Sequence, residues 1–400
     1  MDILTTGSGL FAAWAAGPAC DAFLRWRRLA APRGGARPAA PGRAPKKLLA
    51  VIPSRAEGAR VGDLAEDLRK EGVDVLVLLD GPDLDAEARL TRDSVHYLSK
   101  KSPGPAKGHT LAFLVERMGD ELDAYDFILV FDADMRLPEG FFRDMNVPDG
   151  TEAFQLPVRP AGVPGSGAPR VEALSLAEAR LDDAARDAEG LPVRLRGKAM
   201  GFSPRAFRLG PAAATRTTAE DSEATLALLA KGFAVRALSG PFAFDEPAPA
   251  AAAMARSRAR WFGGHLKLLA TGLRDVLRLV ARSPEGAFVL ACDLWLRPRL
   301  FVLFALAFLA VASDVALLLF SSKGAWTLLL LFLLLLSLEA KMALIFEWLS
   351  LAAVRRRIGY PPEVPAVTPG DLLSSLSMWA HAAGRGLLAP SRWHRARPSA

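Results

Sequence analysis

The chain contains very little cysteine and histidine. Its 400 residues include two cysteines, Cys20 and Cys292, and five histidines. Two cysteines cannot cross-link a chain of this length, which excludes a disulfide scaffold and favours a reducing compartment. The few scattered cysteines and histidines also argue against a structural zinc site, because such a site needs four of these side chains close together.

The balance of charged and apolar residues limits the protein class further. Charged residues make up 23% of the chain and hydrophobic residues 51%. This is too much charge for a channel built of membrane spans, and it is too apolar for a disordered chain. We therefore expect a soluble domain attached to a membrane part. The net charge is +7, but the basic residues cluster beside the apolar segments instead of forming one stripe, so we expect no nucleic-acid partner.

Short apolar runs alternate with helical patterns after residue 46. The runs are 48–53, 73–79, 94–98 and 127–131, and 107–118 has the pattern of a helix. This alternation is typical of a parallel sheet buried on both faces. Such sheets bind ligands beyond the carboxyl ends of their strands. Two of the runs end there in an aspartate, Asp80 and Asp132.

The C-terminal half carries long apolar segments. Residues 300–320 and 325–349 are separated by the short sequence SSKG, and arginines flank the pair. We expect an antiparallel hairpin through a membrane with both ends in the cytoplasm; the alternative is a buried helical hairpin in a soluble domain. Residues 257–280 have the pattern of one amphipathic helix at the membrane interface, with arginine, lysine and tryptophan along it.

Two pairs of acidic residues are candidates for catalysis. Asp132 and Asp134 follow an apolar run at a spacing of two, which places both carboxylates on one side of the chain. That arrangement suits Mg²⁺ or Mn²⁺, which takes one or two carboxylates together with phosphate oxygens; two solvated loop acids are the alternative. Glu220 and Asp221 precede a second helical pattern, where they can also serve only to stabilise the helix dipole.

Four further residues are candidates for ligand binding. Asp80 can accept hydrogen bonds from a ribose or a base edge, although a turn aspartate before Gly-Pro needs no ligand. Lys107 opens a helix, where its ammonium and the free N–H groups favour an anion; an ordinary surface lysine is the alternative. Arg260 and Trp261 lie in the basic amphipathic segment, which is also explained by an interfacial helix with an aromatic anchor.

Taken in order, these segments resemble the family 2 glycosyltransferases, in particular the branch of the cellulose and hyaluronan synthases and the ceramide glucosyltransferases. The matching segments are VIPSRAEG, VLVLLDG, KGHTLAF, FDADMRL, AEDSEATLALLAKGF and DEPAPAAAAMARSRARW. They cover residues 46–265. The resemblance departs at Ser257, where the family has Gln or Arg, and at Ser54–Glu57, where it usually has an Asn-Glu pair. These departures leave the contacts to the donor nucleotide open.

The resemblance implies an α/β GT-A (Rossmann-like) fold, a mostly parallel sheet flanked by helices, followed by a C-terminal transmembrane hairpin. It implies an inverting transfer of a sugar from a nucleotide sugar, by expectation a UDP-sugar, to a lipid or glycan acceptor at a membrane, with Mg²⁺ or Mn²⁺. The implied roles are nucleotide binding by Asp80 and Lys107, metal binding by Asp132 and Asp134, general base catalysis by Asp221 beside Glu220, and contact with the diphosphate and acceptor by Arg260 and Trp261. A catalytically inactive membrane scaffold and a nucleotidyltransferase are the alternatives.

The same features give the expected domain organisation. The apolar N-terminal stretch lacks a preceding Lys or Arg, so it does not have the basic start of a cleavable signal peptide. The expected parts are a membrane anchor at 1–28, a linker at 29–45, the GT-A catalytic domain at 46–255, interfacial helices at 256–296, the transmembrane hairpin at 297–354 and a tail at 355–400. We expect a multi-pass protein of the bacterial inner membrane with its catalytic domain in the cytoplasm.

Overall fold

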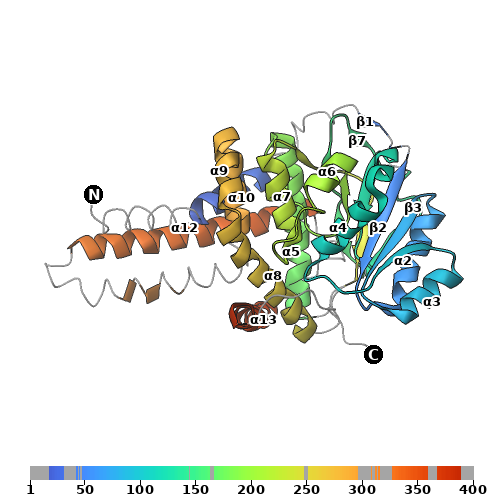
Figure 1. Ribbon diagram of the computed structural model, residues 1–400. Coiled ribbons are helices and arrows are strands. Elements are labelled where there is room, and N and C mark those ends of the chain that lie inside the picture. Colours follow the sequence, from blue (N-terminus) through green and yellow to red (C-terminus); the bar gives the residue numbers. More distant parts are fainter. Residues whose placement is uncertain are drawn as a thin grey trace. The chain divides into compact units, whose positions relative to one another are not determined.

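The computed structural model describes residues 18–30, 42–43, 45, 47–143, 145–162, 166–246, 251–295, 308, 311–312, 314–315, 327–358 and 367–388. The chain divides into two compact units. Unit 1 comprises residues 1–34 and 288–360, and unit 2 comprises residues 35–287 and 361–400. Unit 2 contains every candidate site residue named above and all the strands that the structure describes (Figure 1).

The strands are β1 (Gly42–Arg43), β2 (Leu48–Ser54), β3 (Asp74–Asp80), β4 (His96–Lys100), β5 (Phe127–Val130), β6 (Met135–Arg136), β7 (Val147–Pro148), β8 (Ala153–Gln155), β9 (Val158–Pro160), β10 (Met200–Phe202), β11 (Val235–Ala237) and β12 (Ala243–Asp245). The helices are η1 (Gly58–Arg60), α2 (Val61–Lys70), α3 (Leu84–Arg92), α4 (Lys107–Met118), η2 (Gly119–Ala124), α5 (Ala168–Glu189), α6 (Pro204–Leu209), α7 (Glu220–Ala230), α8 (Ala251–Thr271), α9 (Leu273–Arg282), α10 (Pro284–Trp295), α12 (Thr327–Ile358) and α13 (Pro369–Leu388).

The main sheet has seven strands in the order β11-β8-β10-β5-β2-β3-β4. The four apolar runs of the sequence form β2, β3, β4 and β5, which pair in parallel as predicted. The sheet is mostly parallel as predicted, and β11 and β8 also pair in parallel. It is mixed only because β10 lies between β5 and β8 and runs antiparallel to both. Two smaller sheets, β6-β12-β9 and β1-β7, complete unit 2.

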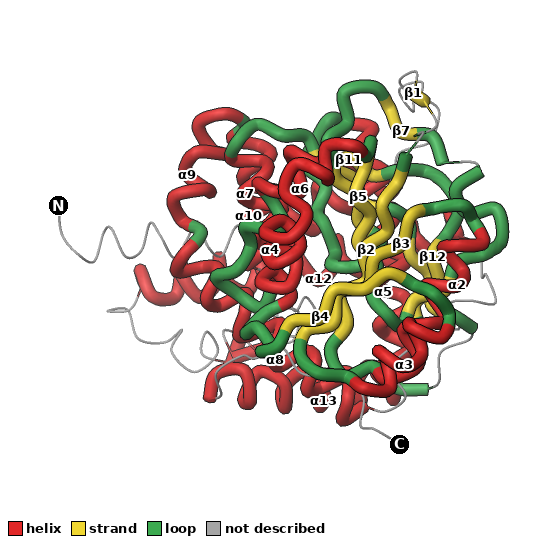
Figure 2. The backbone as a smooth tube through the Cα atoms, turned by 45° about the vertical axis from the view of Figure 1, so that its right-hand side comes forward, coloured by secondary structure: helices red, strands yellow, loops and turns green. Residues whose placement is uncertain are grey.

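The parallel strands are buried on both faces. Alternate residues of β2, among them Ile52, belong to a hydrophobic core that also includes Leu64 of α2 and Leu90 of α3. Leu49 and Val51 point to the opposite face and are also buried. Figure 2 shows α2 and α3 on one side of these strands and α4 and α6 on the other. This layering leaves the carboxyl ends of the strands open for a site.

The basic amphipathic segment forms two helices instead of the single helix predicted over 257–280. It breaks at Gly272, between α8 and α9. A Cβ at Gly272 would lie 2.8 Å from the carbonyl oxygen of Leu268 and 2.9 Å from Cδ2 of Leu226. Only glycine therefore permits the close packing of this corner against α7.

The C-terminal helix α13 packs along α8 and α5 of unit 2. Asp371 in its first turn accepts hydrogen bonds from the backbone N–H groups of Thr368 at 2.8 Å and Gly167 at 2.5 Å. Hydrogen bonds from these backbone groups lower the pKa of Asp371 to about 2. The loop before α5 and the start of α13 are thereby fastened together.

Unit 1 contains the helix at residues 18–30 and α12. Arg25 donates to Glu347 of α12 at 2.7 Å, and this ion pair is buried. Among the described residues, no helix is both long enough and apolar enough to cross a membrane. The span predicted over 325–349 falls on α12 and is therefore not supported within the described residues. The span predicted over 300–320 lies almost entirely outside the described residues.

Candidate active site

One cavity of unit 2 gathers nearly all of the residues singled out in the sequence. It has a volume of about 220 Å³. The predicted residues along its wall are Lys107, Asp132, Asp134, Glu220, Asp221, Arg260 and Trp261. Further wall residues include Arg258 of the ARSRARW segment, and Arg55, Arg196 and Lys198, which were not assigned a role from the sequence. Asp80 is not part of this wall.

The cavity lies where several elements of unit 2 end or begin. Asp132 and Asp134 follow β5, Lys107 is the first residue of α4, and Glu220 is the first residue of α7. Strand ends and helix starts meet at the carboxyl edge of a parallel sheet. Segments far apart in the sequence therefore contribute side chains to one space.

Lys107 forms a hydrogen-bonded ion pair with Asp132. Its Nζ donates to Oδ1 of Asp132 at 2.5 Å and to the carbonyl oxygen of Gly197 at 2.7 Å. The Lys107 residue is 4% exposed. Burial acts to raise the pKa of Asp132, but Lys107 and Lys198 outweigh it and hold that pKa below its usual value. Asp132 is therefore ionised at neutral pH.

The second aspartate has a buried oxygen with no partner. Oδ1 of Asp134 makes no hydrogen bond to any described residue. Nearby, Nζ of Lys198 donates to Oδ1 of Asp245 at 2.6 Å. Burial opposes the charge on Lys198, but Asp134 and Asp245 raise its pKa well above the usual range.

These two carboxylates fit a hard divalent cation. Asp132 is ionised and Asp134 offers an unpaired oxygen, and Mg²⁺ or Mn²⁺ is commonly held by one or two carboxylates together with phosphate oxygens. Within the described part of the chain, no group of three or more His, Cys, Asp or Glu side chains could hold a metal. The remaining ligands would have to come from a phosphate-bearing substrate and water.

The second acidic pair lies in the first turn of α7. Burial raises the pKa of Glu220 to about 7. The charge of Lys107 acts against this rise, and the charge of Asp221 adds to it. Oδ1 of Asp221 accepts the backbone N–H of Ser222 at 2.7 Å, and its Oδ2 lies 3.8 Å from Nη2 of Arg194. Asp221 therefore touches both the helix backbone and the cavity.

Comparison with known proteins identifies the family. Residues 127–349, more than half of the chain, match the model of glycosyl transferase family group 2. The chain belongs to that family. Among solved structures, the mannosyltransferase PcManGT from Pyrobaculum calidifontis, in complex with GDP-Man and Mn²⁺, is similar with a TM-score of 0.49 and 13% identity, covering 84% of this chain and 97% of that chain. None of the curated proteins matches the sequence significantly.

Family membership rules out one of the alternatives that the sequence left open. The protein is a nucleotide-sugar glycosyltransferase with a GT-A-like fold, a mixed sheet flanked by helices. This excludes the nucleotidyltransferase alternative. The matched residues include both acidic pairs and Arg260-Trp261, whereas Asp80 and Lys107 precede the match. The match covers the family as a whole, so the cellulose synthase and ceramide glucosyltransferase branch stays a prediction.

The carboxylate of Asp80 is bonded to Arg55 and to the backbone of Gly104, and Asp80 does not line the cavity. Its carboxylate accepts Nε of Arg55 at 2.8 Å and the N–H of Gly104 at 3.0 Å. Arg55 in turn lines the cavity. Residues 54–57 are where the sequence departs from the family pattern, and that departure is the signal by which Arg55 could have been found.

Arg260 and Trp261 are held at the cavity by α8. Oγ1 of Thr218 donates to the carbonyl oxygen of Arg260 at 2.9 Å. The two segments approach so closely that a Cβ at Gly264 would lie 2.7 Å from the backbone nitrogen of Ala219. Arg260 lines the cavity, and its positive charge helps to lower the pKa of both Asp132 and Glu220.

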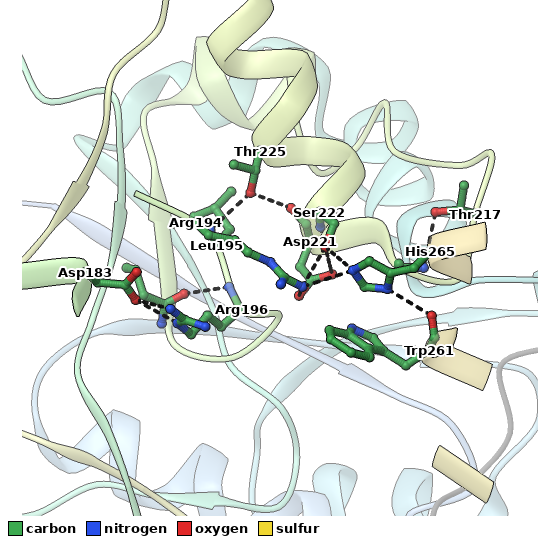
Figure 3. Close-up of polar contacts among 12 residues, drawn as sticks. Asp183, Arg194, Leu195, Arg196, Thr217, Asp221, Ser222, Thr225, Trp261 and His265 are labelled. Carbon is green, nitrogen blue, oxygen red and sulfur yellow. Dashed lines mark hydrogen bonds and ion pairs between the residues drawn. The ribbon is translucent and has the colours of Figure 1, made fainter. Parts of the chain in front are cut away.

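A buried polar cluster lies behind Asp221 and was not foreseen from the sequence. Figure 3 shows the Arg194 side chain reaching toward Asp221 and His265, with the Trp261 indole beside them. Oγ of Ser222 lies 2.8 Å from Arg194 and 3.1 Å from His265. No motif in the sequence connects these residues, because they come from three separate segments.

Proposed function

We propose that this family 2 glycosyltransferase is a metal-dependent, inverting enzyme that transfers a sugar from a nucleoside diphosphate sugar to an acceptor hydroxyl. The observation that carries the proposal is the single cavity that joins two acidic pairs to Arg260 and Trp261. One pair suits a cation and the other suits a proton acceptor. An arginine that lines the cavity beside these carboxylates is the group expected to bind a diphosphate.

The diphosphate of the donor is assigned to the end of the cavity that contains Asp132 and Asp134. These two carboxylates would hold Mg²⁺ or Mn²⁺, and the ion would supply neutralisation of the charge on the departing nucleoside diphosphate. The Arg260 guanidinium offers further N–H donors to the diphosphate oxygens. Lys107 holds Asp132 in place through its 2.5 Å hydrogen bond, so its role is to orient a metal ligand.

Asp221 is assigned as the general base. The acceptor oxygen attacks the anomeric carbon as the bond from that carbon to the diphosphate oxygen breaks, and the acceptor's hydroxyl proton passes to the Asp221 carboxylate. General base catalysis of this kind contributes about 10²–10⁴-fold to the rate. Glu220, whose pKa burial raises to about 7, is the alternative base of the pair. Trp261 is assigned to the acceptor side of the cavity.

The acceptor is assigned to a membrane surface with anionic lipids. A row of exposed apolar side chains follows α8 and α9, namely Leu266, Leu269, Leu273, Leu277 and Val280. Lys267, Arg274 and Arg278 each follow one of these leucines and are also exposed. An apolar row with cations along its edge suits the interface of an anionic bilayer. A lipid or lipid-linked acceptor would then approach from the same surface.

A panel of UDP-, GDP- and other nucleotide sugars tests the catalytic part of the proposal. In the presence of Mn²⁺, one donor should raise the melting temperature of the purified protein and support sugar transfer, and a chelator should abolish both. The expected UDP-sugar is one member of the panel. Absence of any metal-dependent stabilisation or transfer across the panel would refute the proposal.

Sedimentation with lipid vesicles tests the membrane part. The protein should bind vesicles that contain anionic phosphatidylglycerol more than vesicles of phosphatidylcholine alone. The double substitution Leu273→Glu and Leu277→Glu should abolish this binding. Leu84→Glu is the matched control, since Leu84 is 77% exposed on α3, away from the apolar row. Equal binding by the double variant and the control would exclude this surface.

A further inference from the structure

His265 lies next to the cavity wall. It contacts Trp261, which lines the cavity, and Ser222, which contacts the wall residue Asp221. It is 5% exposed, and its neighbours Arg194 and Ser222 are 1% and 0% exposed. None of the three lines the cavity. His265 comes from α8, whereas Ser222 comes from the first turn of α7. A histidine in this place joins the two helices that carry Trp261 and Asp221.

The neighbours of the imidazole determine where its proton is. Nδ1 of His265 lies 3.0 Å from the carbonyl oxygen of Trp261, and a carbonyl oxygen can only accept. Nδ1 therefore carries the hydrogen. Nε2 lies 3.2 Å from Nη2 of Arg194, and a guanidinium can only donate. Nε2 is therefore an acceptor, and the ring is a neutral imidazole protonated on Nδ1.

The contacts of Ser222 extend this cluster to the carboxylate. Nη2 of Arg194 donates to Oγ of Ser222 at 2.8 Å. The hydroxyl hydrogen of Ser222 then has two acceptors in reach, Nε2 of His265 at 3.1 Å and Oδ1 of Asp221 at 3.3 Å. Arg194 also lies 3.8 Å from Oδ2 of Asp221. Arg194 and Ser222 therefore connect the carboxylate of Asp221 to the imidazole.

The cluster fixes the tryptophan of the cavity as well. The rings of His265 and Trp261 lie 4.0 Å apart between centroids, at an interplanar angle of 59°. Cζ of Arg194 lies 5.2 Å from the centroid of the Trp261 ring, within the range of a cation–π contact. The ring centroids of Trp261 and Trp379, a residue of α13, lie 6.3 Å apart. The indole is therefore contacted by side chains of three segments.

We propose that His265 is a positioning residue of the transferase, which as a neutral Nδ1–H imidazole fixes Trp261 and, through Ser222 and Arg194, the orientation of the Asp221 carboxylate. This inference rests on the proposed function, in which Asp221 is the base. A small displacement of a reacting group lowers a rate strongly, whereas the donor contacts at Asp132 and Asp134 are unaffected. Loss of His265 should therefore lower kcat and leave donor binding intact.

Kinetics of three variants test this. His265→Phe keeps a ring but loses both polar contacts, and it should lower kcat about 10- to 100-fold while the KM for the donor changes little. His265→Gln places an acceptor near the position of Nε2 and should recover most of the loss. His96→Phe makes the same change at an exposed histidine of β4 and should leave kcat unaltered. Nucleotide binding with Mn²⁺ is measured in parallel by calorimetry.

The possible results separate the two proposals. The positioning role would be overturned if His265→Phe kept the wild-type kcat, or if it lost kcat and nucleotide binding in parallel. It would also be overturned if the kcat of His265→Gln were no higher than that of His265→Phe. Where His265→Phe does not fold, Ser222→Ala takes its place, with the same expected fall in kcat alone. A wild-type protein without turnover would overturn the proposed function instead. In that case ¹⁵N NMR of the histidine rings still tests the cluster: a hydrogen on Nε2 of His265 would overturn it.

Discussion

Arg55 and Asp80 form an ion pair that turns the aspartate away from the cavity. Nε of Arg55 donates to Oδ2 of Asp80 at 2.8 Å, and the Asp80 side chain has no exposed surface. The backbone N–H of Gly104 donates to the same carboxylate at 3.0 Å. In this structure the arginine, not the aspartate, reaches the cavity wall. We therefore propose that Asp80 acts on the donor through Arg55.

Substitution of Asp80 tests that relation. Asp80→Asn leaves the buried end of Arg55 without its counter-charge and should destabilise the protein by about 3 kcal/mol. Arg55→Met added to Asp80→Asn should restore part of this stability, because one of the two cations beside Asp80 is then gone, the other being Lys100 at 3.7 Å. Urea denaturation of the four proteins of the cycle measures the coupling. Strictly additive effects of the two substitutions would show that the pair is not coupled.

Substitution of Asp134 tests the cation site. Asp134→Asn keeps the shape of the side chain but removes the negative charge of the carboxylate, whose Oδ1 has no hydrogen-bond partner among the described residues. We expect the Mn²⁺-dependent affinity for a nucleoside diphosphate to fall by at least about 10-fold, because a carboxylate is a far better ligand of a hard cation than an amide. The matched control is Asp63→Asn, which loses an ion pair with Arg136 outside the cavity. Equal affinities in both variants would exclude Asp134 as a metal ligand.

The raised pKa of Glu220 predicts a pH dependence of stability. The folded pKa is about 7, against 4.5 for the unperturbed group. Between these values the folded protein holds a proton that the unfolded chain has released, so the contribution of Glu220 to stability is present below about pH 4.5 and is lost as the pH rises through about 7. Glu220→Gln does not titrate.

Glu220→Gln should therefore gain stability relative to wild type as the pH rises. We expect the difference in unfolding free energy to grow by roughly 1–3 kcal/mol between about pH 4.5 and about pH 8. Urea denaturation of both proteins without divalent cations measures it. The control is Glu66→Gln, at a half-exposed glutamate of α2. A constant difference between wild type and Glu220→Gln would mean that Glu220 titrates normally.

The parts of the fold that the sequence predicted are those with a local pattern. The apolar runs gave the four parallel strands, and the helix predicted at 107–118 matches α4. Strands β8 and β10 were not predicted, because each has three residues and no alternation can be recognised over that length. The break at Gly272 was also missed, since it depends on contact with Leu226, which is distant in sequence.

The candidate site shows the same division. Spacing and order drew attention to Asp132, Asp134, Glu220 and Asp221, because these acids lie next to recognisable strand ends and helix starts. The residues that orient them could not be found this way. Arg194 lies 3.8 Å from Asp221 only because the segment before β10 folds back across the start of α7. Such contacts are set by tertiary packing and leave no spacing in the sequence.

Asp221→Asn is the sharpest test of the assigned mechanism. The side chain of Asp221 has a structural role, since its Oδ1 accepts the N–H of Ser222 at 2.7 Å. An asparagine oxygen can accept the same hydrogen bond, and asparagine is as good as aspartate at a helix start. The main structural loss is the 3.8 Å ion pair with the buried Arg194, so the protein should lose about 2–3 kcal/mol of stability.

The catalytic consequence of the same substitution should be much larger. An amide cannot accept the proton of the acceptor hydroxyl, so kcat should fall by about 10²–10⁴-fold while the donor and Mn²⁺ still bind. Glu220 lines the same cavity, but adjacent residues at a helix start project about 100° apart, so its carboxylate does not take the position of the Asp221 carboxylate. Asp187→Asn, which loses an ion pair with Arg236 outside the cavity, is the matched control and should keep full turnover. Turnover in Asp221→Asn equal to that of the control would assign Asp221 to the helix start alone and would leave the proton of the acceptor to another group of the cavity.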